Sequence, residues 1–353
     1  MTTDEPRVAI LVLNWNGFNN TSECLESLMK ISYSNFEIVM IDNGSSDGSI
    51  NQIKETLMRS AQPFSVLEYS REEAEGGGNR QNEIEFEKAE VKRRMKIIVN
   101  KENLGYSGGN NVGIRHVLAT GKPKYILILN NDTIVDERFL TELVATAEKM
   151  PGLGFLGPKV LYHDFNGKKN MISFAGGLID MWTGEARHIG DREEDVGQYD
   201  VPRYVDYVEG SCIMTSCDAV RRIGVLDPRF FMYWEESDWC IRGRTQGYKS
   251  IYVPGSVIWH KLELDGESAK HTFFKIRNMF WFMRRNASIP QYILSLAHQP
   301  IIFARLASGG GLSAIAEYLK GAWQGIWAHV EEQDRLRILE RSDSVITLHP
   351  SKR

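Results

Sequence analysis

The sequence contains few cysteines and no strong excess of charge of either sign. Its 353 residues include four cysteines, and no two of them form a CxxC pair. This spacing argues against both a disulfide framework and a zinc site, and it favours reduced, mostly buried thiols. The net charge is −4 with both signs interleaved along the chain, so the basic surface that nucleic acid requires is not expected.

Signals for export and for membrane insertion are also missing. The opening segment, MTTDEPRVAI, lacks a basic stretch followed by an apolar core, which predicts that the protein works in the cytoplasm. The apolar segments near the C-terminus are interrupted by His, Gln, Arg, Lys or Pro, so a membrane-spanning helix is not expected. Trp323 and Trp327, with Arg305 and Lys320 nearby, leave two alternatives open: helices that lie on a membrane surface, or a helical cap packed on the core.

The first 150 residues alternate short apolar runs with amphipathic segments. The runs at 8–13, 36–41, 96–99 and 125–129 are almost continuously hydrophobic, which is typical of parallel strands covered on both faces. Each run is followed by amides, carboxylates or glycines. These side chains should gather at one rim of a sheet, where open α/β sheets bind their ligands. The pattern predicts a nucleotide-binding α/β layer.

Three other regions depart from this pattern. Residues 68–95 are polar, rich in charge and interrupted by glycine, which predicts an insertion that buries little apolar surface, either a solvated hairpin of helices or locally disordered. After Pro151 the chain becomes mixed and rich in aromatic residues, and we expect this half to face an acceptor. From residue 268 onward the pattern is helical, over 268–286 and again over the two long segments that follow.

The strand-like run at 125–129 stops on Asn130, Asn131 and Asp132. A carboxylate just beyond the end of a parallel strand is well placed for a divalent cation, because such cations take oxygen ligands. A plain turn is the alternative, with Asp136 capping the helix that follows. The residues of this segment alone leave both interpretations open.

The first two strand ends, LNWNG at 13–17 and IDNGSSDGS at 41–49, have the composition of a nucleotide cradle. Asp42 can accept a hydrogen bond from the imide N–H of uracil or thymine, while the small residues Gly44 and Ser45 let the backbone approach a ribose. Asp47 is better interpreted as the cap of the next helix.

Two further segments carry candidate functional groups. In NLGYSGGNNVGIRHVL at 103–118, glycines at 108 and 109 are predicted to open a helix whose first-turn N–H groups could bind a diphosphate or a sugar. In WEESDWCIRGRTQG at 234–247, Glu235 and Glu236 form an adjacent pair of carboxylates. Asp238 and Arg242 are four residues apart, which predicts a salt bridge within a helix.

Five motifs in this order, LNWNG, IDNGSSDGS, NLGYSGGNNVGI, LNNDT and FFMYWEESDWCIR, closely resemble family 2 inverting glycosyltransferases of the GT-A fold, and within them rhamnosyltransferase-like enzymes. The resemblance covers residues 7–285. It implies an α/β fold, a Rossmann-like mixed sheet flanked by helices, with a GT-A domain over 1–265 and a C-terminal helical extension over 266–353. It also implies a nucleotide-diphosphate sugar donor, either a dTDP- or a UDP-sugar, and a hydroxyl acceptor on a glycan or a lipid-linked molecule.

The resemblance assigns Asp132 to the last acid of the family's DxD motif, which binds Mn²⁺ or Mg²⁺. The first acid of that motif is Asn130 here, and an amide coordinates a cation less strongly than a carboxylate. His260, at the position of a family histidine ligand, is the candidate that compensates, and its imidazole favours manganese. Asn130 is then expected to touch a hydroxyl of the donor.

Glu236 aligns with the family's catalytic base, which removes the proton of the acceptor hydroxyl. The family usually has Glu-Asp here, so the Glu-Glu of this chain leaves Glu235 as a possible substitute. Tyr233 and Trp234 are expected to stack on the acceptor. The residues assigned to the nucleotide or donor are Asn14, Asn16, Asp42, Asn43, Ser45, Gly108, Gly109, Asn110, Asn130 and Asn131.

Two alternatives belong to other classes of protein. A non-catalytic nucleotide-sugar-binding or scaffold protein of the same fold is suggested by Asn130 and by the long helical tail. A nucleotidyltransferase would need a glycine-rich loop with a lysine for a triphosphate, and LNWNGFNN contains neither. The sugar, the nucleotide and the acceptor cannot be read from the sequence, because sugar selectivity depends on the geometry of a few hydrogen bonds.

Overall fold

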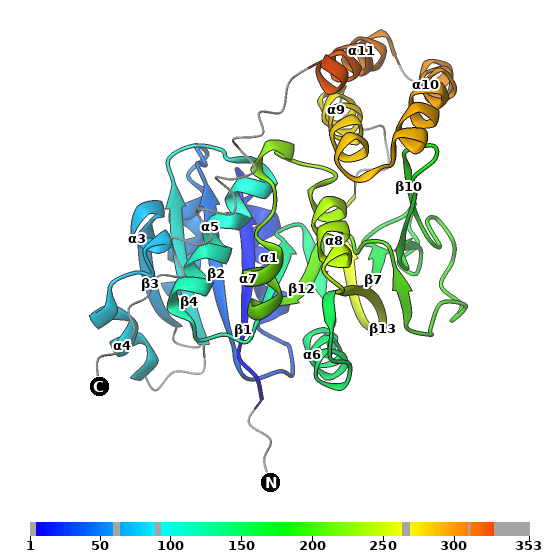
Figure 1. Cartoon of the computed structure of the whole chain (residues 1–353). Coiled ribbons are helices and arrows are strands. Elements are labelled where there is room, and N and C mark those ends of the chain that lie inside the picture. The colour runs from blue at the N-terminus through cyan, green and yellow to red at the C-terminus, as the bar shows by residue number, and fades with distance from the viewer. Residues whose placement is uncertain (1–4, 59–63, 89–92, 263–268, 310, 328–353) are drawn as a thin grey trace, which may run out of the picture.

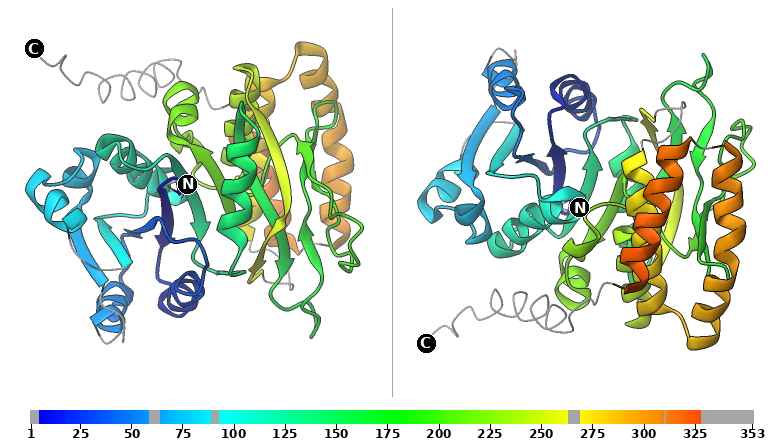
Figure 2. Two further views of the ribbon diagram at one scale, coloured as in Figure 1. Left: turned by 90° about the horizontal axis from the view of Figure 1, so that it is seen from below. Right: turned by 90° about the horizontal axis from the view of Figure 1, so that it is seen from above.

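The computed structural model describes residues 5–58, 64–88, 93–262, 269–309 and 311–327. In this part of the chain a large mixed sheet forms the centre of the protein, and helices pack against it (Figure 1; Figure 2). Its strands are β1 (Val8–Asn14), β2 (Phe36–Asn43), β3 (Phe64–Ser70), β4 (Arg93–Asn100), β5 (Tyr125–Asn130), β6 (Thr133–Val135), β7 (Leu153–Tyr162), β8 (Ile172–Phe174), β11 (Arg203–Val205), β12 (Cys212–Ser216) and β13 (Lys249–His260). Two further strands, β9 (Gly177–Asp180) and β10 (Glu185–His188), form a separate antiparallel ribbon.

Nine helical segments lie between the strands, within the described residues. They include one short 3₁₀ helix, η1. Their bounds are α1 (Phe18–Leu28), α2 (Ser49–Met58), α3 (Arg71–Glu75), α4 (Arg80–Lys88), α5 (Gly105–Thr120), α6 (Phe139–Lys149), α7 (Cys217–Ile223), η1 (Pro228–Phe230) and α8 (Glu235–Thr245), and the last of these leads directly into β13.

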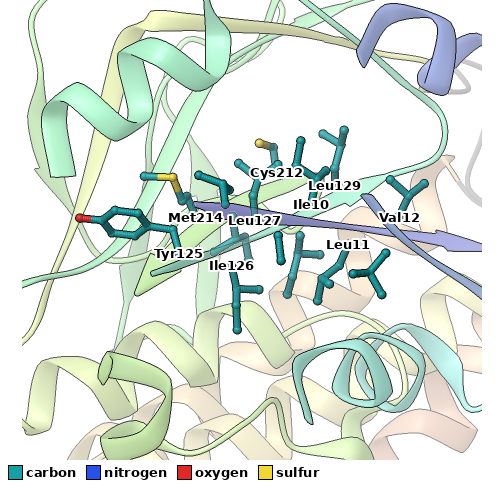
Figure 3. Close-up of a cluster of buried hydrophobic side chains, with 14 of the residues drawn as sticks. Ile10, Leu11, Val12, Tyr125, Ile126, Leu127, Leu129, Cys212 and Met214 are labelled. Carbon is teal, nitrogen blue, oxygen red and sulfur yellow. The ribbon is translucent and has the colours of Figure 1, made fainter. Parts of the chain in front are cut away.

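The four strands predicted in the first half are confirmed as β1, β2, β4 and β5. β1 pairs in parallel with both β2 and β5, and β4 pairs in parallel with β2 and β3. Their apolar side chains, such as Ile10, Leu11 and Leu127, are fully buried in the core shown in Figure 3. A strand that is apolar at every position suits this place because both faces of the sheet are covered. The register sets Asn14 opposite Asp42 at the carboxyl ends.

The sheet becomes mixed beyond β5, as the resemblance implied. The strand order is β11-β13-β7-β12-β5-β1-β2-β4-β3, with β6 on β13 and β8 on β7. β12 is antiparallel to both of its neighbours, while β7 and β13 are parallel to each other. The antiparallel pairing of β6 with β13 sets His260 opposite Thr133. This pairing brings the end of β13 to the polar residues that follow β5.

The helices predicted for the charged segment 68–95 are present, but the prediction that the segment is solvated and buries little apolar surface is wrong. Its first residues belong to β3, an edge strand of the main sheet, and its last ones belong to β4. The helices α3 and α4 lie between them, and Ala74 and Phe86 are buried. A helical hairpin is therefore present, but it packs on the sheet. Residues 89–92 lie outside the described part of the chain.

Ion pairing explains how so polar a segment can pack. Lys96 on β4 is fully buried, and its Nζ lies 3.0 Å from Glu83 Oε2 of α4 and 3.4 Å from Glu37 Oε2 of β2. Arg7 reaches the same Glu37 oxygen at 2.6 Å. A buried ammonium is tolerated only when it is paired in this way. The charged composition of the segment predicted solvated side chains. In the structure these side chains pair with opposite charges inside the fold.

The predicted C-terminal helices are present as α9 (Ala269–Asn286), α10 (Ile289–Gly309) and α11 (Leu312–Trp327). They form a layer at one end of the molecule (Figure 1). α11 packs closely on α9 at Gly321. A Cβ at this position would come within 2.7 Å of the Phe273 carbonyl oxygen, so glycine permits the close approach. α9 also buries Met279, Phe280 and Met283 in a cluster with Phe230. This helix thus connects the C-terminal layer to the rest of the protein.

Two predictions about the whole chain can be compared with this fold. Within the described residues, no helix is both long and apolar enough to cross a membrane, in agreement with the sequence pattern. All four cysteines are free and buried, as their spacing predicted.

Candidate functional site

A hydrogen-bonded network joins the carboxyl ends of β1 and β2. The Asn14 side-chain amide donates to Asp42 Oδ1 at 2.9 Å and to the hydroxyls of Ser45 and Ser49 at 3.1 and 3.0 Å. Its oxygen accepts a hydrogen bond from the Thr21 hydroxyl at 2.7 Å. Asn14 is fully buried. The structure therefore brings Asn14, Asp42 and Ser45 together, with Asn14 as the buried centre of the network.

Asn16 forms the exposed side of the same network. It adopts a left-handed backbone conformation with φ of 50°, its N–H donates to Ser45 Oγ at 2.9 Å, and its side-chain oxygen accepts from the Ser46 N–H at 2.8 Å. Asp47 accepts a hydrogen bond at 2.9 Å from the N–H of Ser49, the first residue of α2, in agreement with its predicted role at the start of this helix. The rim formed here is shaped by short side chains.

Asn43, which we assigned to the donor, ties β2 to the turn before α5. Its amide nitrogen donates to Asn103 Oδ1 at 2.9 Å and to the Gly105 carbonyl at 3.1 Å. Its oxygen accepts from the Leu104 N–H at 3.2 Å and from the Asn100 amide at 3.1 Å. The side chain is buried and its hydrogen-bonding capacity is used within the protein.

The prediction that α5 opens at Gly108 is wrong, because the helix begins at Gly105. The N–H of Gly105 donates to Asn103 Oδ1 at 2.8 Å, and the N–H of Ser107 donates to the Phe231 carbonyl at 3.1 Å. Two of the N–H groups that a helix start offers to an anion are thus already satisfied by the protein. The Asn103 side chain accepts a hydrogen bond from the N–H of Gly105, so the helix begins at Gly105 and not at Gly108. The glycine pattern in the sequence did not reveal this contact.

Gly109 and Asn110 lie in the interior of α5 and are buried. A Cβ at Gly109 would come within 2.5 Å of Leu13 Cδ1, so glycine allows the helix to approach β1 closely. The Asn110 amide donates to the Tyr106 carbonyl one turn earlier, at 3.0 Å. These positions pack the helix on the sheet.

The residues after β5 are only partly buried, unlike those of β1 and β2. Asn131 donates from its amide to Thr21 Oγ1 at 2.9 Å. The backbone N–H of Asn130 donates to the Ser211 carbonyl at 2.9 Å, and its side-chain amide has no hydrogen-bond partner among the described residues. Asn130 therefore presents an uncommitted amide at the same rim as Asp132.

Asp132 and His260, the two predicted metal ligands, lie side by side. His260 Nε2 is 3.2 Å from Asp132 Oδ1, and the Lys261 N–H donates to the Asp132 carbonyl at 3.0 Å. The Asp132 side chain is 32% exposed, whereas that of His260 is 8% exposed, so a ligand can reach the pair through Asp132 more readily than through His260. No cluster of three or more His, Cys, Asp or Glu side chains suited to a metal occurs among the described residues.

Glu209 is a site residue that the sequence analysis missed. Its Oε1 lies 3.4 Å from His260 Nδ1, so carboxylates flank both ring nitrogens of the histidine. Burial opposes the charged imidazolium, but attraction to Asp132 and Glu209 raises the pKa of His260 to about 10. Burial raises the pKa of the Asp132 and Glu209 carboxyls. The neighbouring His260 outweighs this effect and holds the pKa of each carboxyl below its ordinary value. The only signal in the sequence was a lone carboxylate just before a strand.

Several polar atoms around His260 have no hydrogen-bond partner among the described residues. They are buried, and the short contacts between them are not aligned as hydrogen bonds. Such atoms are uncommon in native proteins and often mark the place of a ligand or an ion. The donor set of one carboxylate and one imidazole suits Mn²⁺, and Mg²⁺ less well. The atoms are Asp132 Oδ1, His260 Nδ1, Glu209 Oε2 and Ser211 Oγ.

The carboxylates of Glu235 and Glu236 occupy the first turn of α8. Burial raises the pKa of both groups, and the charge of Glu236 adds to the increase at Glu235, whose pKa lies well above its ordinary value. The Ser237 hydroxyl donates to Glu236 Oε1 at 3.2 Å, whereas Glu235 Oε2 is buried and has no hydrogen-bond partner among the described residues. Two adjacent acids with raised pKa values are suited to proton transfer.

The segment at 209–211, before β12, connects the two acidic groups. Glu209 contacts His260, and its charge also raises the pKa of Glu236. A Cβ on Gly210 would lie 3.9 Å from Glu235 Oε1, and the Gly210 carbonyl accepts a hydrogen bond from the Tyr106 hydroxyl at 2.6 Å. The predicted metal ligands and the predicted base are therefore neighbours across one short segment.

The predicted salt bridge in α8 is confirmed, and it extends beyond the helix. Arg242 Nε lies 2.7 Å from Asp238 Oδ2, and the same guanidinium donates to the carbonyls of Ile223 and Val225 at 2.8 Å each. Arg285 of α9 also contacts Asp238, at 3.2 Å. These contacts give Asp238 and Arg242 a structural role.

Tyr233 and Trp234, predicted to stack on an acceptor, immediately precede the acidic pair. Both adopt left-handed backbone conformations, with φ of 67° and 71°. The Trp234 ring packs on Phe282 with a centroid separation of 4.8 Å, and the Tyr233 ring meets His271 edge-on at 5.6 Å. Both side chains remain partly exposed.

Two family models match this chain. The model described as "Glycosyltransferase like family 2" matches residues 78–282, and that described as "Glycosyl transferase family 2" matches residues 9–91. The low-salt glycan biosynthesis hexosyltransferase Agl10 of Haloferax volcanii is 27% identical over 242 residues, which cover 66% of this chain and 76% of that protein. The N-acetylglucosaminyl-diphospho-decaprenol L-rhamnosyltransferase of Mycobacterium tuberculosis is 26% identical over 206 residues, which cover 54% of this chain and 66% of that protein.

Solved structures show the same fold at low sequence identity. The mannosyltransferase PcManGT from Pyrobaculum calidifontis, in complex with GDP-Man and Mn²⁺, superimposes with a TM-score of 0.52 at 15% identity and covers 98% of this chain and 86% of that one. GalNAc-T7 with UDP, GalNAc and Mn²⁺ superimposes with a TM-score of 0.57 at 13% identity and covers 92% of this chain and 59% of that one. These neighbours are GT-A glycosyltransferases, so the fold inferred from the sequence motifs is confirmed.

Proposed function

Because the chain belongs to glycosyltransferase family 2 and is a glycosyltransferase that uses a nucleotide-sugar donor, we propose that it inverts the anomeric carbon during transfer. The donor would be a dTDP- or UDP-hexose, and the acceptor a hydroxyl of a glycan or of a lipid-linked molecule. The observation that carries the proposal is the proximity of the Asp132–His260 and Glu235–Glu236 pairs across the segment at 209–211. An inverting displacement needs both a place for the leaving diphosphate and a base for the acceptor.

Asp132 and His260 would hold a Mn²⁺ or Mg²⁺ ion. When bound, such an ion supplies positive charge for the leaving nucleotide diphosphate. Glu209 Oε1 lies 3.4 Å from the other ring nitrogen of His260, where a carboxylate can orient a histidine ligand. Lys261, whose Nζ is 2.7 Å from Glu23 Oε2, is a further cation beside Asp132. The partly buried Asn130 has a free amide for a ribose or sugar hydroxyl.

The residues at the ends of β1 and β2 and at the start of α5 fall into two groups: accessible residues that can contact the donor, and buried residues that hold the rim in place. Asn16, Ser45 and Asn131 lie at the accessible rim, where they can reach the donor. Asp42 accepts internal hydrogen bonds on both carboxylate oxygens, and each oxygen retains a second lone pair for the imide N–H of a uracil or thymine. The buried residues Asn14, Asn43, Gly109 and Asn110 support this rim, whereas Gly108 remains partly accessible in the first turn of α5.

Glu236 is the proposed base. The acceptor oxygen attacks the anomeric carbon from the face opposite the diphosphate, the bond to the diphosphate oxygen breaks, and the hydroxyl proton passes to the Glu236 carboxylate. Burial and the charge of Glu236 both raise the pKa of Glu235, so we assign the proton that the pair takes up first to Glu235 and the role of base to Glu236. Tyr233 and Trp234, just before the pair, would stack on the acceptor.

A donor panel tests this function. Purified protein is mixed with dTDP- and UDP-sugars with or without Mn²⁺, and thermal stability and release of nucleoside diphosphate are both measured. We expect one nucleotide sugar with Mn²⁺ to stabilise the protein and to be turned over, because a ligand that binds only the folded state raises its stability. Stabilisation without any turnover, with or without candidate acceptors, would favour the alternative of a non-catalytic nucleotide-sugar-binding protein.

We also propose peripheral contact with the cytoplasmic face of a membrane, through an exposed apolar stripe on α11. Leu312, Leu319, Trp323 and Trp327 are 87, 55, 67 and 65% exposed and recur at helical spacing on one face. Tryptophan side chains favour the interface between lipid headgroups and acyl chains, and Lys320 beside the stripe suits anionic lipids. The relative from M. tuberculosis is named for a decaprenol-linked acceptor, which would reside in a membrane.

Vesicle sedimentation tests this contact. Replacing Trp323 and Trp327 by serine should release the protein from anionic vesicles. Val196, which is 78% exposed on another part of the surface, provides the matched control as Val196→Ser. Equal binding of wild type and the double variant to these vesicles would exclude the α11 stripe as the contact.

A further inference from the structure

The loop that leads into the acidic pair is held in an unusual backbone conformation. Phe231, Tyr233 and Trp234 have φ of 65°, 67° and 71°, in the left-handed region that residues with a side chain rarely adopt. Glycine would adopt this conformation without strain, but none of the three is glycine. Surrounding contacts must therefore impose it, and such conformations gather at functional sites.

A single side chain of α9 supplies three contacts to the carbonyls of this loop. Asn278 is fully buried, and its amide nitrogen lies 2.8, 2.7 and 2.9 Å from the carbonyl oxygens of Phe230, Met232 and Tyr233. The Asn278 oxygen accepts from Arg277 Nε at 2.9 Å, which fixes the orientation of the amide. One residue from outside the loop thus contacts three of its peptide groups.

The other carbonyls of the loop are satisfied elsewhere. The Phe231 carbonyl accepts from the Ser107 N–H of α5 at 3.1 Å, and the Trp234 carbonyl accepts from the Asp238 N–H within α8. Arg277 Nη2 also reaches the Phe230 carbonyl, at 3.0 Å. Among the described residues, the Met232 carbonyl is held by Asn278 alone, and the Tyr233 carbonyl accepts from the same amide. Without this amide the Met232 carbonyl would lose its partner close to Glu235.

We propose that Asn278 is a positioning residue that sets the loop at 230–234, and through it the carboxylates of Glu235 and Glu236, in the geometry needed for proton removal. This inference deepens the proposed function and rests on it. Asn278 lies 42 positions after Glu236 in sequence (278 − 236 = 42) and outside the predicted GT-A domain of 1–265. The C-terminal helical region would thereby complete the active site.

The test uses Asn278→Asp in the full chain. This change keeps the size of the side chain and the acceptor for Arg277, but it replaces the donating NH₂ by an oxygen that repels the carbonyls. We expect kcat to fall by about 10²-fold, the scale of a small misplacement of a catalytic group, with the KM for the donor nearly unchanged. Amide hydrogen exchange in peptides spanning 228–238 should become faster, a readout that does not depend on activity.

Gln299→Ala is the matched control. Gln299 is a buried amide of α10 that donates to the Ser295 carbonyl at 3.0 Å and makes no contact with the loop at 230–234. We expect this variant to lose thermal stability, because a buried polar contact is removed, while kcat and exchange of the loop stay at wild-type values. A fall in kcat equal to that of Asn278→Asp would mean that general loosening of the helical layer is responsible, and it would overturn the proposal.

Unchanged kcat and unchanged loop exchange in Asn278→Asp would also overturn it. Absence of transfer in the wild type would instead contradict the proposed function. In that case faster loop exchange in Asn278→Asp alone would still show that Asn278 sets this loop.

Discussion

The end of β1 and β2 and the surroundings of His260 lie on the same sheet but differ in how their polar atoms are satisfied. At β1 and β2 every side-chain nitrogen and oxygen of Asn14, Asp42 and Asn43 has a partner within the protein. Around His260, buried atoms of Asp132 and Glu209 have no hydrogen-bond partner among the described residues. The buried side chains of the first region are satisfied without a ligand, whereas those of the second lack interactions that a ligand can supply.

Five predictions test this contrast. Changes to the acidic side chains near His260 and on α8 should reduce activity or metal binding more than stability, and a change at β1 and β2 should do the opposite. They follow from the largest expected effect to the smallest.

Replacing Glu236 by Gln should have the largest effect, a fall in transfer of about 10²–10⁴-fold, because the amide cannot accept the proton of the acceptor. Donor binding, measured by thermal shift, should be retained. Full turnover by Glu236→Gln together with inactivity of Glu235→Gln would assign the base to Glu235.

The pH dependence of kcat/KM sharpens the same assignment. A raised pKa means that Glu236 takes up a proton at a higher pH than an ordinary carboxyl, so activity should fall as the pH is lowered through that raised pKa. In Glu235→Gln this acid limb should stay near its wild-type position, because the proposed mechanism assigns the proton of the pair to Glu235, and a neutral amide replaces that protonated carboxyl. A large displacement of the limb would show that Glu235 is ionised in the active enzyme.

Asp132→Ala should abolish stabilisation by the donor with Mn²⁺, which would amount to about 2.7 kcal/mol in the wild type at a donor concentration 100 times its Kd. Asn130→Asp, which restores a carboxylate, should bind Mn²⁺ more tightly. Asp136→Ala is the control, because Asp136 accepts a hydrogen bond from the Arg138 N–H and lies away from His260. Equal Mn²⁺ dependence in Asp132→Ala and the wild type would remove Asp132 from the metal site.

Glu209→Gln should weaken Mn²⁺ binding by about 10–100-fold, the range found when the second partner of a histidine ligand is lost. Electron paramagnetic resonance of free Mn²⁺ measures this directly and does not require turnover. An unchanged affinity would show that Glu209 does not support His260.

Asn14→Ala should act mainly on stability. Loss of the central amide leaves buried groups of Asp42 and Thr21 without partners, at a cost of about 1–3 kcal/mol in the free energy of unfolding. Urea denaturation measures this cost, and Mn²⁺ affinity should not change. A selective loss of metal binding without loss of stability would break the contrast between the two regions.

The sequence predicted the parts of this protein that depend on local pattern. Strands that are apolar at every position and polar residues at their ends are visible in one dimension, so the strands at 8–13 and 36–41 and the proximity of Asn14 to Asp42 followed. The proximity of Asp132 and His260 was predicted from the resemblance to the family and not from a local pattern. These residues are far apart in the chain and meet through the pairing of β6 with β13.

The features that were missed depend on tertiary contacts. Glu209 looks like any carboxylate before a strand until His260 is placed beside it. The start of α5 is set by the Asn103 side chain and by Phe231, which belongs to a distant loop. Asn278 carries no motif at all, and its role is visible only from the three carbonyls that surround it.

The buried Lys96 has a consequence for the order in which the chain assembles. Pairing of β4 with β2 buries the Lys96 ammonium, and the desolvation penalty is small only when Glu83 of α4 is already in contact with it. Glu37 alone is not enough, because it also pairs with Arg7. The docking of the edge strands and of the helical hairpin should thus be a single cooperative event. A shortened chain that lacks the hairpin would keep the Lys96 ammonium in its interior but would lose Glu83, one of its two carboxylate partners.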